Sequence, residues 1–462
     1  MITLSVLVTL LREVLRTLAT PVRLLLYLPR RHHWRRVARE VLDAAAHAPA
    51  GGGDAGADDA VLAQLVARAR ERASCCPGSA PTVFVSAGEA SGEAHAAALV
   101  RRLQELPGGP VRVRAFGGAP LREAGAEVLY PLSEHAVMGF FAVLGQLPQI
   151  LRAFAAFLRM LRADPPDLVV LVDYPGLHVV MAKACRRRRV PVLHYVAPQY
   201  WAWGPWRMRR YRRAVDATLT ILPFETAFFR RFAVPARYIG HPLLDQLAAH
   251  PPAPADVAAA RARPTLCLLP GSRRSEIAAN LPGMVRVARA LRAEHQDLRV
   301  VLPHRDPRRT ELLRQLLQEL GADFVEHREG ALAPWLAGAR LVLAKSGTGS
   351  LEACLFGNPV IVVYQLRSLL NALGYHNILS VPFIAAANLI AGRRVVPEHC
   401  FRGDGGWDRV LHDARALWRD GPERARCTSD LREVRRRLGE PGATARVAQL
   451  VRQVLDHGED RR

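Results

Sequence analysis

Short apolar runs alternate with helical stretches along most of the chain. Runs of this length, rich in β-branched residues and bounded by glycine or polar residues, are typical of strands buried on both faces of a sheet. In the first half these runs are Thr82–Ser86, Val111–Phe116, Leu168–Val172, Val190–Tyr195 and Ala217–Ile221. In the second half they are Leu266–Leu269, Arg299–Leu302, Leu341–Ala344 and Val360–Tyr364. Because strands that alternate with helices form parallel sheets, the pattern predicts an α/β fold with doubly wound sheets.

A proline-rich break at His250–Pro254 divides this pattern into two parts. It predicts two Rossmann-like domains, residues 81–247 and 264–400, joined by a hinge over 248–263. Ligands of such sheets bind beyond the carboxyl ends of the strands, so a cleft between the two domains is expected. Residues 401–462 are arginine-rich and predicted to be helical.

The first 48 residues predict an amphipathic, basic helical extension. Apolar residues recur there at three- and four-residue steps, at Leu4, Val8, Leu11, Leu15, Leu18, Val22 and Leu25. Arginines follow on a neighbouring strip and in a cluster, at Arg12, Arg16, Arg23, Arg30, Arg31, Arg35, Arg36 and Arg39. Charges interrupt the apolar run well before the roughly 20 residues of a membrane span, and they also interrupt any secretory signal. Two interpretations stay open: a helix that lies on an anionic membrane, and a helix that packs on the protein itself. Residues 49–80 are rich in alanine and glycine and predict a linker with one helix near Val61–Arg72.

Composition adds little to the identification of a partner. Half of the 462 residues are hydrophobic and 23% are charged, as in ordinary globular proteins. The net charge of +22 suggests anionic partners, but only Lys183 and Lys345 are lysines, and an excess of arginine and alanine is typical of codon bias. No RNA- or DNA-binding signature accompanies the charge, so we expect no nucleic-acid partner. The seven cysteines form no CxxC pair and no metal-ligand spacing, which predicts reduced thiols in a cytosolic protein and no metal.

Three segments at predicted strand ends of the first half carry candidate chemistry. Gly88–Glu93 lies where the first strand meets a helix, and its two carboxylates, Glu89 and Glu93, suit a neutral hydroxyl-bearing ligand better than a phosphate. Asp173 follows the strand Leu168–Val172, where it either points into the cleft or caps the next helix. His194–Trp203 places two tryptophans beside a strand end, as a structural wedge or as a surface for a ligand.

Two segments of the second half resemble nucleotide-binding loops. Pro270–Glu276 offers a glycine, a serine and a helix start to a diphosphate, and Arg273 adds a bidentate cation. Lys345–Ala353 is another loop of small residues that opens a helix, with Glu352 one turn later for ribose hydroxyls. Each alone could be an ordinary turn, but two in one domain predict a nucleotide site.

With these segments in place, the chain resembles the lipid-A-disaccharide synthases, inverting glycosyltransferases of the two-Rossmann (GT-B) type. The motifs that carry the resemblance occur in order between about Val83 and Pro397. They are Ala87–Glu93, Val137–Gly139, Leu144–Gly145, Tyr195–Trp203, Leu222–Glu225, Ile239–Pro242, Leu269–Arg273, Ser346–Thr348, Leu351–Glu352 and Asn388–Gly392.

The resemblance implies transfer of 2,3-diacylglucosamine from its UDP derivative to 2,3-diacylglucosamine 1-phosphate, which forms a β-1,6-linked disaccharide 1-phosphate and UDP. The family's essential carboxylate matches Asp173, which is expected to be the base with Glu89 as a rival, and its essential arginine matches Arg273. The UDP-sugar is expected to bind Gly271, Ser272, Arg273, Glu276, Ser346, Gly347, Thr348, Glu352 and Asn388. The acceptor and its acyl chains are expected to contact Gly88, Ser91, Glu93, Met138, Phe140, Phe141, Trp201 and Trp203.

The resemblance further implies no cofactor and no metal, a cytoplasmic location with peripheral attachment to the anionic inner membrane, and a homodimer through the C-terminal helices as an expectation. The chain departs from the family pattern at Glu93, Gly176, Ala197 and His399–Phe401, and its first 80 residues have no counterpart in a typical member. Alternatives are another GT-B enzyme that uses a UDP-sugar, such as a UDP-N-acetylglucosamine 2-epimerase or a peptidoglycan-type transferase, and an inactive membrane-bound relative. Neither of those enzymes explains Tyr195–Trp203 together with Gly88–Glu93.

Overall fold

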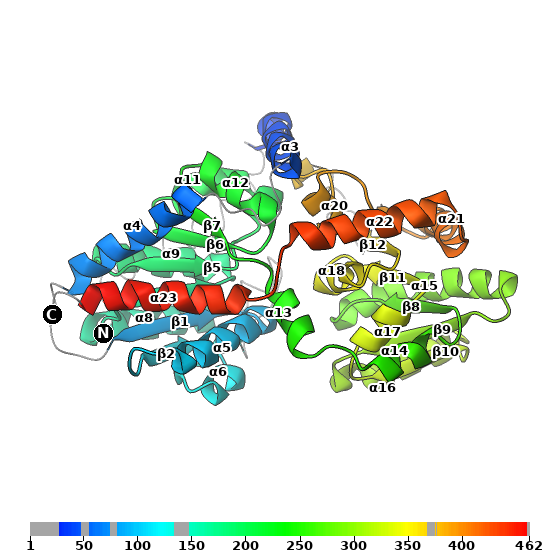
Figure 1. Cartoon of the computed structure of the whole chain (residues 1–462), viewed down its shortest axis with the longest axis horizontal. Helices are drawn as coiled ribbons and strands as arrows, with labels where there is room; N and C mark the ends of the chain where they lie inside the picture. The colour runs from blue at the N-terminus through cyan, green and yellow to red at the C-terminus, as the bar shows by residue number, and fades with distance from the viewer. Residues whose placement is uncertain are drawn as a thin grey trace. The chain divides into compact units, whose positions relative to one another are not determined.

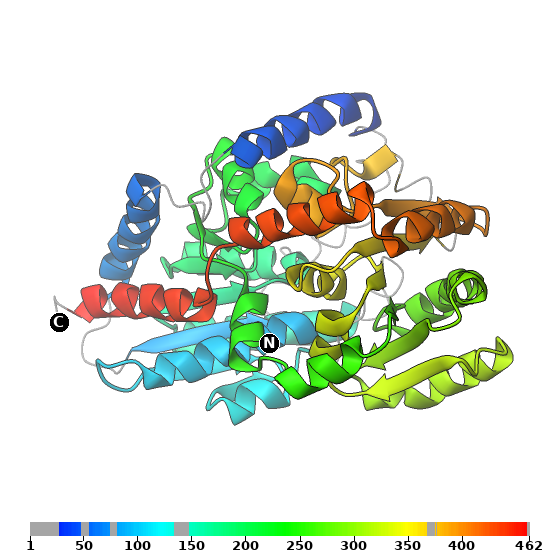
Figure 2. The same cartoon turned by 45° about the vertical axis from the view of Figure 1, so that its right-hand side comes forward.

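Two separate parallel sheets organise the computed structural model, which describes residues 27–47, 55–73, 81–133, 147–366, 375 and 377–459. The chain forms two units, each built around one of the sheets (Figures 1 and 2). Unit 1 comprises Met1–His32, Gly51–Asp245 and Glu440–Arg462, and unit 2 comprises His33–Ala50 and Gln246–Gly439. The predicted α/β architecture with two parallel sheets is confirmed.

The seven strands of unit 1 run in the order β3-β2-β1-β4-β5-β6-β7. Their bounds are β1 (Thr82–Ala87), β2 (Arg112–Phe116), β3 (Glu127–Tyr130), β4 (Leu168–Val172), β5 (Val192–Tyr195), β6 (Ala217–Thr220) and β7 (Ala236–Tyr238). Ala87 pairs with Val172, and Val172 pairs with Tyr195. Strands β1, β4 and β5 therefore end at one level, and the loops that follow them start side by side.

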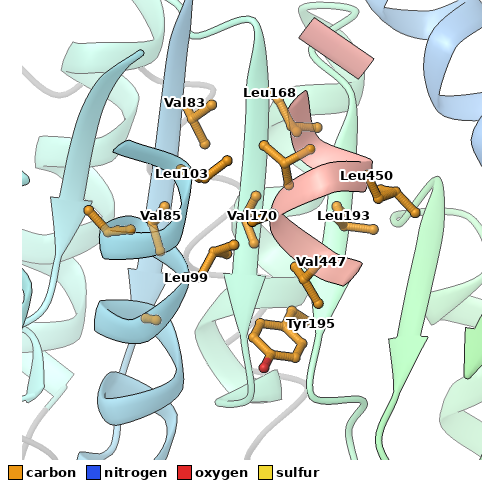
Figure 3. Close-up of a cluster of buried hydrophobic side chains, with 14 of the residues drawn as sticks. Val83, Val85, Leu99, Leu103, Leu168, Val170, Leu193, Tyr195, Val447 and Leu450 are labelled. Atoms are coloured by element: carbon orange, nitrogen blue, oxygen red, sulfur yellow. The ribbon is translucent and has the colours of Figure 1, made fainter. Parts of the chain in front are cut away.

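Helices from three distant parts of the sequence build unit 1. They are α4 (Ala55–Ala73), α5 (Ala90–Glu105), α6 (Ala119–Glu123), α8 (Leu147–Ala163), α9 (Pro175–Arg187), α10 (Tyr200–Trp203), α11 (Met208–Tyr211), α12 (Pro223–Arg231), α13 (Pro242–Ala249) and α23 (Ala443–Glu459). The C-terminal helix α23 packs against α4 and α5. Figure 3 shows Val447 of α23 beside Tyr195 and Leu450 beside Leu193 of β5, all of them buried in the same cluster as Val83 and Val170. The sequence after unit 2 thus completes the core of unit 1.

Polar contacts fix the start of α23 in unit 1. The carboxylate of Asp245 accepts hydrogen bonds from the backbone N–H groups of Gly442 (2.6 Å), Ala443 (3.1 Å) and Thr444 (2.8 Å). Three otherwise unpaired N–H groups at a helix N-terminus are satisfied in this way. The anchor sets where the apolar face of α23 meets the sheet.

Unit 2 has six parallel strands in the order β10-β9-β8-β11-β12-β13. Their bounds are β8 (Thr265–Leu269), β9 (Arg299–His304), β10 (Val325–Glu329), β11 (Leu341–Lys345), β12 (Val360–Leu366) and β13 (Glu398–Arg402). The helices of this unit are α3 (Arg31–His47), α14 (Pro254–Arg261), α15 (Arg274–Glu294), α16 (Thr310–Glu319), α17 (Ala333–Gly338), α18 (Thr348–Leu355), α20 (Ala386–Ala391), α21 (Gly406–Trp418) and α22 (Pro422–Arg437).

All nine predicted strands are present, and four further strands were not predicted. Strands β3, β7, β10 and β13 are short, lie at or next to sheet edges, and have side chains of mixed polarity and exposure. The expectation that the chain is helical from about Phe401 is wrong at its start, because β13 extends to Arg402. Helix α4 lies where a linker with one helix was expected, and the apolar repeat Leu4–Leu25 lies outside the described residues. Every helix in the described part of the chain is too short or too polar to span a bilayer.

Candidate active site

In unit 1, the loop that follows β1 packs closely against the loop that follows β4. Gly88 follows β1, and a Cβ atom at this position would overlap the ring of Tyr174, which follows β4. Gly92, in the first turn of α5, lies against Asp173, since a Cβ there would be 3.5 Å from the Asp173 Cβ. Glycines at both positions let the loop that carries Glu89 approach the loop that carries Asp173.

The backbone at Asp173 is held in an uncommon conformation. Asp173 and Tyr174 have φ angles of 54° and 46°, in the left-handed region that side chains rarely adopt. Two buried histidines contact the carbonyl oxygen of Asp173: Nδ1 of His178 lies at 2.7 Å and Nε2 of His194 at 3.0 Å. The other ring nitrogen of His178 lies 2.9 Å from the hydroxyl of Ser86 in β1. Backbone strain of this kind persists only where surrounding contacts impose it, as these do.

Burial and charge tune the titratable groups of this pair of loops. Burial, and next the negative charge of Glu89, raise the pKa of the Asp173 carboxyl to about 6. Burial lowers the pKa of His178 to about 3 and that of His194 to about 4. Both imidazoles are therefore neutral near pH 7 and each can donate its single N–H to the Asp173 carbonyl. A carboxylate with a pKa near 6 is suited to accept a proton at neutral pH.

The other acceptor residues predicted in unit 1 differ in their placement. Ser91 is exposed. Glu93 is buried, and its carboxylate accepts a hydrogen bond from the backbone N–H of Gly118 after β2. Trp201 is only 6% exposed and donates its indole N–H to the buried Glu225 at 3.0 Å, whereas Trp203 is 44% exposed. Met138, Phe140 and Phe141 lie outside the described residues.

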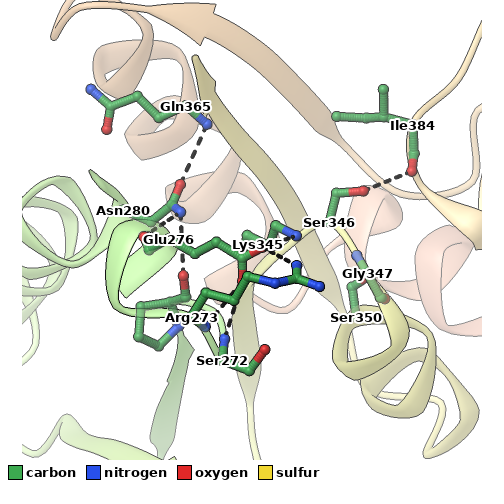
Figure 4. A network of polar contacts seen from close by, with 11 residues as sticks. Ser272, Arg273, Glu276, Asn280, Lys345, Ser346, Gly347, Ser350, Gln365 and Ile384 are labelled. Atoms are coloured by element: carbon green, nitrogen blue, oxygen red, sulfur yellow. Dashed lines mark hydrogen bonds and ion pairs between the residues drawn. The ribbon is translucent and has the colours of Figure 1, made fainter. Parts of the chain in front are cut away.

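In unit 2, the loop after β8 gathers two cations around one carboxylate (Figure 4). Oε1 of Glu276 lies 2.9 Å from a guanidinium nitrogen of Arg273 and 3.0 Å from Nζ of Lys345. Its Oε2 accepts the backbone N–H of Ser272 at 3.2 Å. Burial disfavours the charged form of Glu276, but Lys345 and Arg273 together hold its pKa below the usual value. The Glu276 carboxylate thus holds two cations and one loop amide close together.

Gly271 makes this arrangement sterically possible. Its φ angle is 123°, and a Cβ atom there would lie 2.7 Å from the Cβ of Glu276. The loop is also tied to the sheet through Asn280, whose amide nitrogen donates to the carbonyl of Pro270 at 3.2 Å. The predicted group of Gly271, Ser272, Arg273 and Glu276 is therefore one contiguous cluster.

The loop after β11 supplies the second half of the predicted nucleotide site. Gly347, with a φ angle of 154°, precedes α18, and Thr348 is exposed at the first position of that helix. The hydroxyl of Ser346 donates to the carbonyl of Ile384 at 2.9 Å, which joins this loop to the segment before α20. The predicted loop residues lie together, and two of them remain accessible.

Two predicted nucleotide residues are deeply buried. Glu352 is 1% exposed; its Oε1 pairs with Arg305, while its Oε2 has no hydrogen-bond partner among the described residues. Asn388 is fully buried, and its amide bonds the backbone of Val395 and Val396 and the carboxylate of Glu398. Asn388 therefore shapes the entry to β13, whereas Glu352 has an unsatisfied acceptor.

Sequence reasoning did not assign a role to several residues of these sites. His178 shows no signal beyond its position five residues after Asp173, and Arg305 lies in a loop with no recognised motif. Lys345 did offer a signal, because it is one of two lysines among 64 basic residues and directly precedes the small-residue loop. Among the described residues, no cluster of histidine, cysteine or carboxylate side chains could hold a metal ion.

The chain is similar to known proteins over most of its length. Residues 83–404 match the family model described as lipid-A-disaccharide synthetase. A lipid-A-disaccharide synthase of Myxococcus xanthus is 38% identical over 388 residues, covering 82% of this chain and 98% of that protein. One of Acidobacterium capsulatum is 36% identical over 396 residues, covering 82% and 97%.

Solved structures share the fold at low sequence identity. The S. aureus MnaA–UDP complex has a TM-score of 0.55 at 15% identity and covers 82% of this chain and 97% of that one. The MurG of Acinetobacter baumannii has a TM-score of 0.52 at 16% identity and covers 81% and 99%. These two likenesses concern the fold alone. The family match over most of the chain and the identity with curated relatives go further: this chain belongs to the lipid-A-disaccharide synthase family of glycosyltransferases.

Proposed function

We propose that the chain transfers 2,3-diacylglucosamine from UDP-2,3-diacylglucosamine to the 6-hydroxyl of 2,3-diacylglucosamine 1-phosphate, with Asp173 as the base. The acceptor oxygen forms a bond to the anomeric carbon, its proton passes to the Asp173 carboxylate, and the bond from that carbon to the UDP oxygen breaks. A single displacement inverts the α-linked donor to a β-linked product. The observation that carries this assignment is the partly buried Asp173 carboxylate beside Glu89, with a pKa of about 6.

A cation from the loop after β8 and one from the end of β11 would stabilise the departing UDP. In our proposal Arg273 and Lys345 bind the diphosphate, as their shared position on Glu276 suggests. Amides of the loops at Gly271–Ser272 and Gly347–Thr348 add hydrogen bonds, and the unsatisfied Oε2 of Glu352 suits a ribose hydroxyl. Preorganised donors aimed at a leaving anion lower the barrier without a metal. The S. aureus neighbour of similar fold is described as a complex with UDP, which is consistent with this use of unit 2.

Acyl chains and the membrane form the remaining part of the proposal. We assign the acyl chains to the apolar run Val137–Leu144 and the exposed Trp203, and peripheral attachment to the anionic inner membrane to the basic N-terminal extension. Each buried methylene contributes about 0.8 kcal/mol, so even partial burial of the chains would hold the substrates firmly.

The test is UDP release by the full chain with the acylated donor, with and without acceptor. Asp173→Asn removes the base and should lower the acceptor-dependent rate about a hundredfold or more. Arg273→Ala should lower it by a similar factor, since it removes a cation from the leaving group. Arg274→Ala is the matched control, because Arg274 is the exposed neighbour of Arg273 and should leave the rate unchanged. Full activity of folded Asp173→Asn would refute the assignment of the base, and absence of release by the unaltered chain would indicate an inactive relative.

A further inference from the structure

Helix α3 is an addition to the family fold and packs on unit 2. It precedes the residues that match the family model, which begin at 83. Its apolar face, at Val37, Ala38, Val41 and Leu42, is buried. The helix reaches the turn after α20 so closely that a Cβ at Gly392 would lie 2.8 Å from the Cβ of Ala46. Of the two interpretations left open for the extension, this part of it packs on the protein.

A cavity of about 280 Å³ lies beside α3. Arg35 and Arg39 line it from α3, and the other wall is formed by Tyr375 and Leu379–Pro382. Residues four apart on a helix share a face, so the side chains of Arg35 and Arg39 both line this cavity. Nε of Arg35 also donates to the carbonyl of Leu379 at 3.2 Å, which ties the two walls together. Among the described residues, the lining carries two positive charges and no carboxylate.

The chemistry of the lining selects a class of ligand. Two guanidinium groups match the oxygens of a phosphate, and Tyr375 and Ser380 are the other polar residues of the lining. Leu379, Val381 and Pro382 form an apolar wall for the atoms attached to such a phosphate. The volume is just below the about 300–1,000 Å³ typical of small-molecule sites, which suits a headgroup rather than a nucleotide sugar or acyl chains. We propose that this cavity binds the phosphate group of an anionic lipid headgroup and so fixes unit 2 to a membrane at one defined point.

The segment that forms one wall of this cavity also contacts the loop after β11, which is part of the predicted nucleotide site. The segment whose Leu379 carbonyl bonds Arg35 continues to Ile384, whose carbonyl accepts the Ser346 hydroxyl. The same six-residue stretch therefore contacts the headgroup cavity at one end and the predicted nucleotide loop at the other. The phosphate site is distinct from the nucleotide site but shares a segment with it, and it does not depend on the identity of the sugar substrates.

The experiment compares Arg39→Gln with Arg36→Gln in the full chain. Both arginines are exposed, lie on α3 and form no ion pair with a carboxylate among the described residues, but only Arg39 lines the cavity. Binding is measured by cosedimentation with vesicles of phosphatidylglycerol and phosphatidylcholine, and with phosphatidylcholine vesicles alone. Each substitution should weaken binding to the anionic vesicles about fivefold through the general attraction of one basic side chain. Arg39→Gln should weaken it by a further factor of about ten, because a charged hydrogen bond in the cavity is lost.

A second arm separates a lipid headgroup from a soluble phosphate. Glycerol 1-phosphate is titrated into each variant by calorimetry and is also tested as a competitor of the vesicles. Competition that disappears in Arg39→Gln, together with the larger vesicle defect of this variant, supports the proposal. Equal vesicle defects in the two variants overturn it, because the binding is then ordinary surface attraction. Glycerol 1-phosphate could also bind through Arg39 while the two variants bind the anionic vesicles equally well. That result overturns the proposal of a lipid headgroup and assigns the cavity to a soluble phosphate ester. Matching thermal unfolding curves show that both variants remain folded.

Discussion

At the scale of single residues, burial and the charge of Glu89 together raise the pKa of Asp173. Because burial and this neighbour raise the pKa of Asp173 to about 6, we expect kcat/KM to fall as pH decreases below about 6, where the carboxylate becomes protonated. Glu89→Gln removes the neighbouring negative charge, so the pKa of Asp173 should decrease and the acid limb should move to lower pH. The pH profile of acceptor-dependent UDP release measures this shift.

Glu105→Gln is the control for this pH profile, since Glu105 is at the far end of α5, the helix that Glu89 precedes, is exposed to solvent and pairs with Arg102. Its acid limb should coincide with that of the unaltered chain. If Glu89→Gln abolished transfer while Asp173→Asn retained it, the roles of the two carboxylates would have to be exchanged.

Some site residues could be placed from the sequence because a strand end fixes their position. Asp173 and Arg273 follow buried strands, and the structure places both beyond the carboxyl ends of these strands. Parallel sheets bind ligands at this position. Glu93 and Asn388 could not be placed in this way. Their partners, the Gly118 amide and the backbone near Val395, come from other segments, and nothing local in the sequence shows that these polar side chains turn inward.

At the scale of elements, the contact between the loops after β1 and β4 depends on the absence of a side chain at Gly88. Gly88→Ala places a methyl group in the ring of Tyr174, so the loop that carries Asp173 must shift. We expect a decrease in kcat of at least about tenfold, since small displacements of catalytic groups are costly. Steady-state kinetics of UDP release would detect it.

Gly176→Ala is the matched substitution for this test. Gly176 lies in the first turn of α9, three residues after Asp173, and a Cβ there meets no atom within 4 Å. Its kcat should stay within about twofold of the original value, because alanine also favours the helix. Equal kinetics of the two alanine variants would contradict the tight packing of the loops.

The helix cap at Asp245 gives a second prediction at this scale. Asp245→Ala leaves three N–H groups at the start of α23 without their acceptor. The free energy of unfolding of unit 1 should decrease by about 1–2 kcal/mol, as measured by urea denaturation. Gln449→Ala changes an exposed residue of the same helix and should alter this free energy by less than about 0.5 kcal/mol.

The strands show where the hydrophobic pattern of the sequence predicts a strand and where it does not. Buried runs such as Leu168–Val172 could be predicted because both faces of a central parallel strand are apolar. Strand β10, with the sequence Val-Glu-His-Arg-Glu, lies at a sheet edge, and its exposed polar residues hide the pattern. Pairing with β9 rather than local composition makes it a strand.

At the scale of the whole molecule, the two units are not consecutive in the sequence. The residues of unit 2 from Gln246 to Gly439 separate the main part of unit 1 from α23. Truncation after Gly439 removes Val447, Leu450, Val451 and Val454 from the core of unit 1 and should unfold that unit. Unit 2 contains none of these residues and should keep its resistance to protease.

Limited proteolysis followed by mass spectrometry distinguishes the units in this truncated chain. Fast cleavage confined to Gly51–Asp245 is the expected result. Equal protection of both units would show that α23 contributes little to the core. A chain that lacks only residues 457–462 keeps the buried part of α23 and should be cleaved as slowly as the full chain.

The position of α23 also has a consequence for synthesis on the ribosome. After the strands of unit 1 have emerged, roughly 200 further residues must be translated before Val447 and Leu450 can cover them. At about 5–20 residues per second, Val83, Val170 and their neighbours wait for about 10 to 40 seconds with one side of their sheet incomplete. Unit 2 is complete before that interval ends, so the half made first is the half that finishes folding last. Nascent chains of this protein therefore expose a specific apolar surface to chaperones for nearly half of their translation.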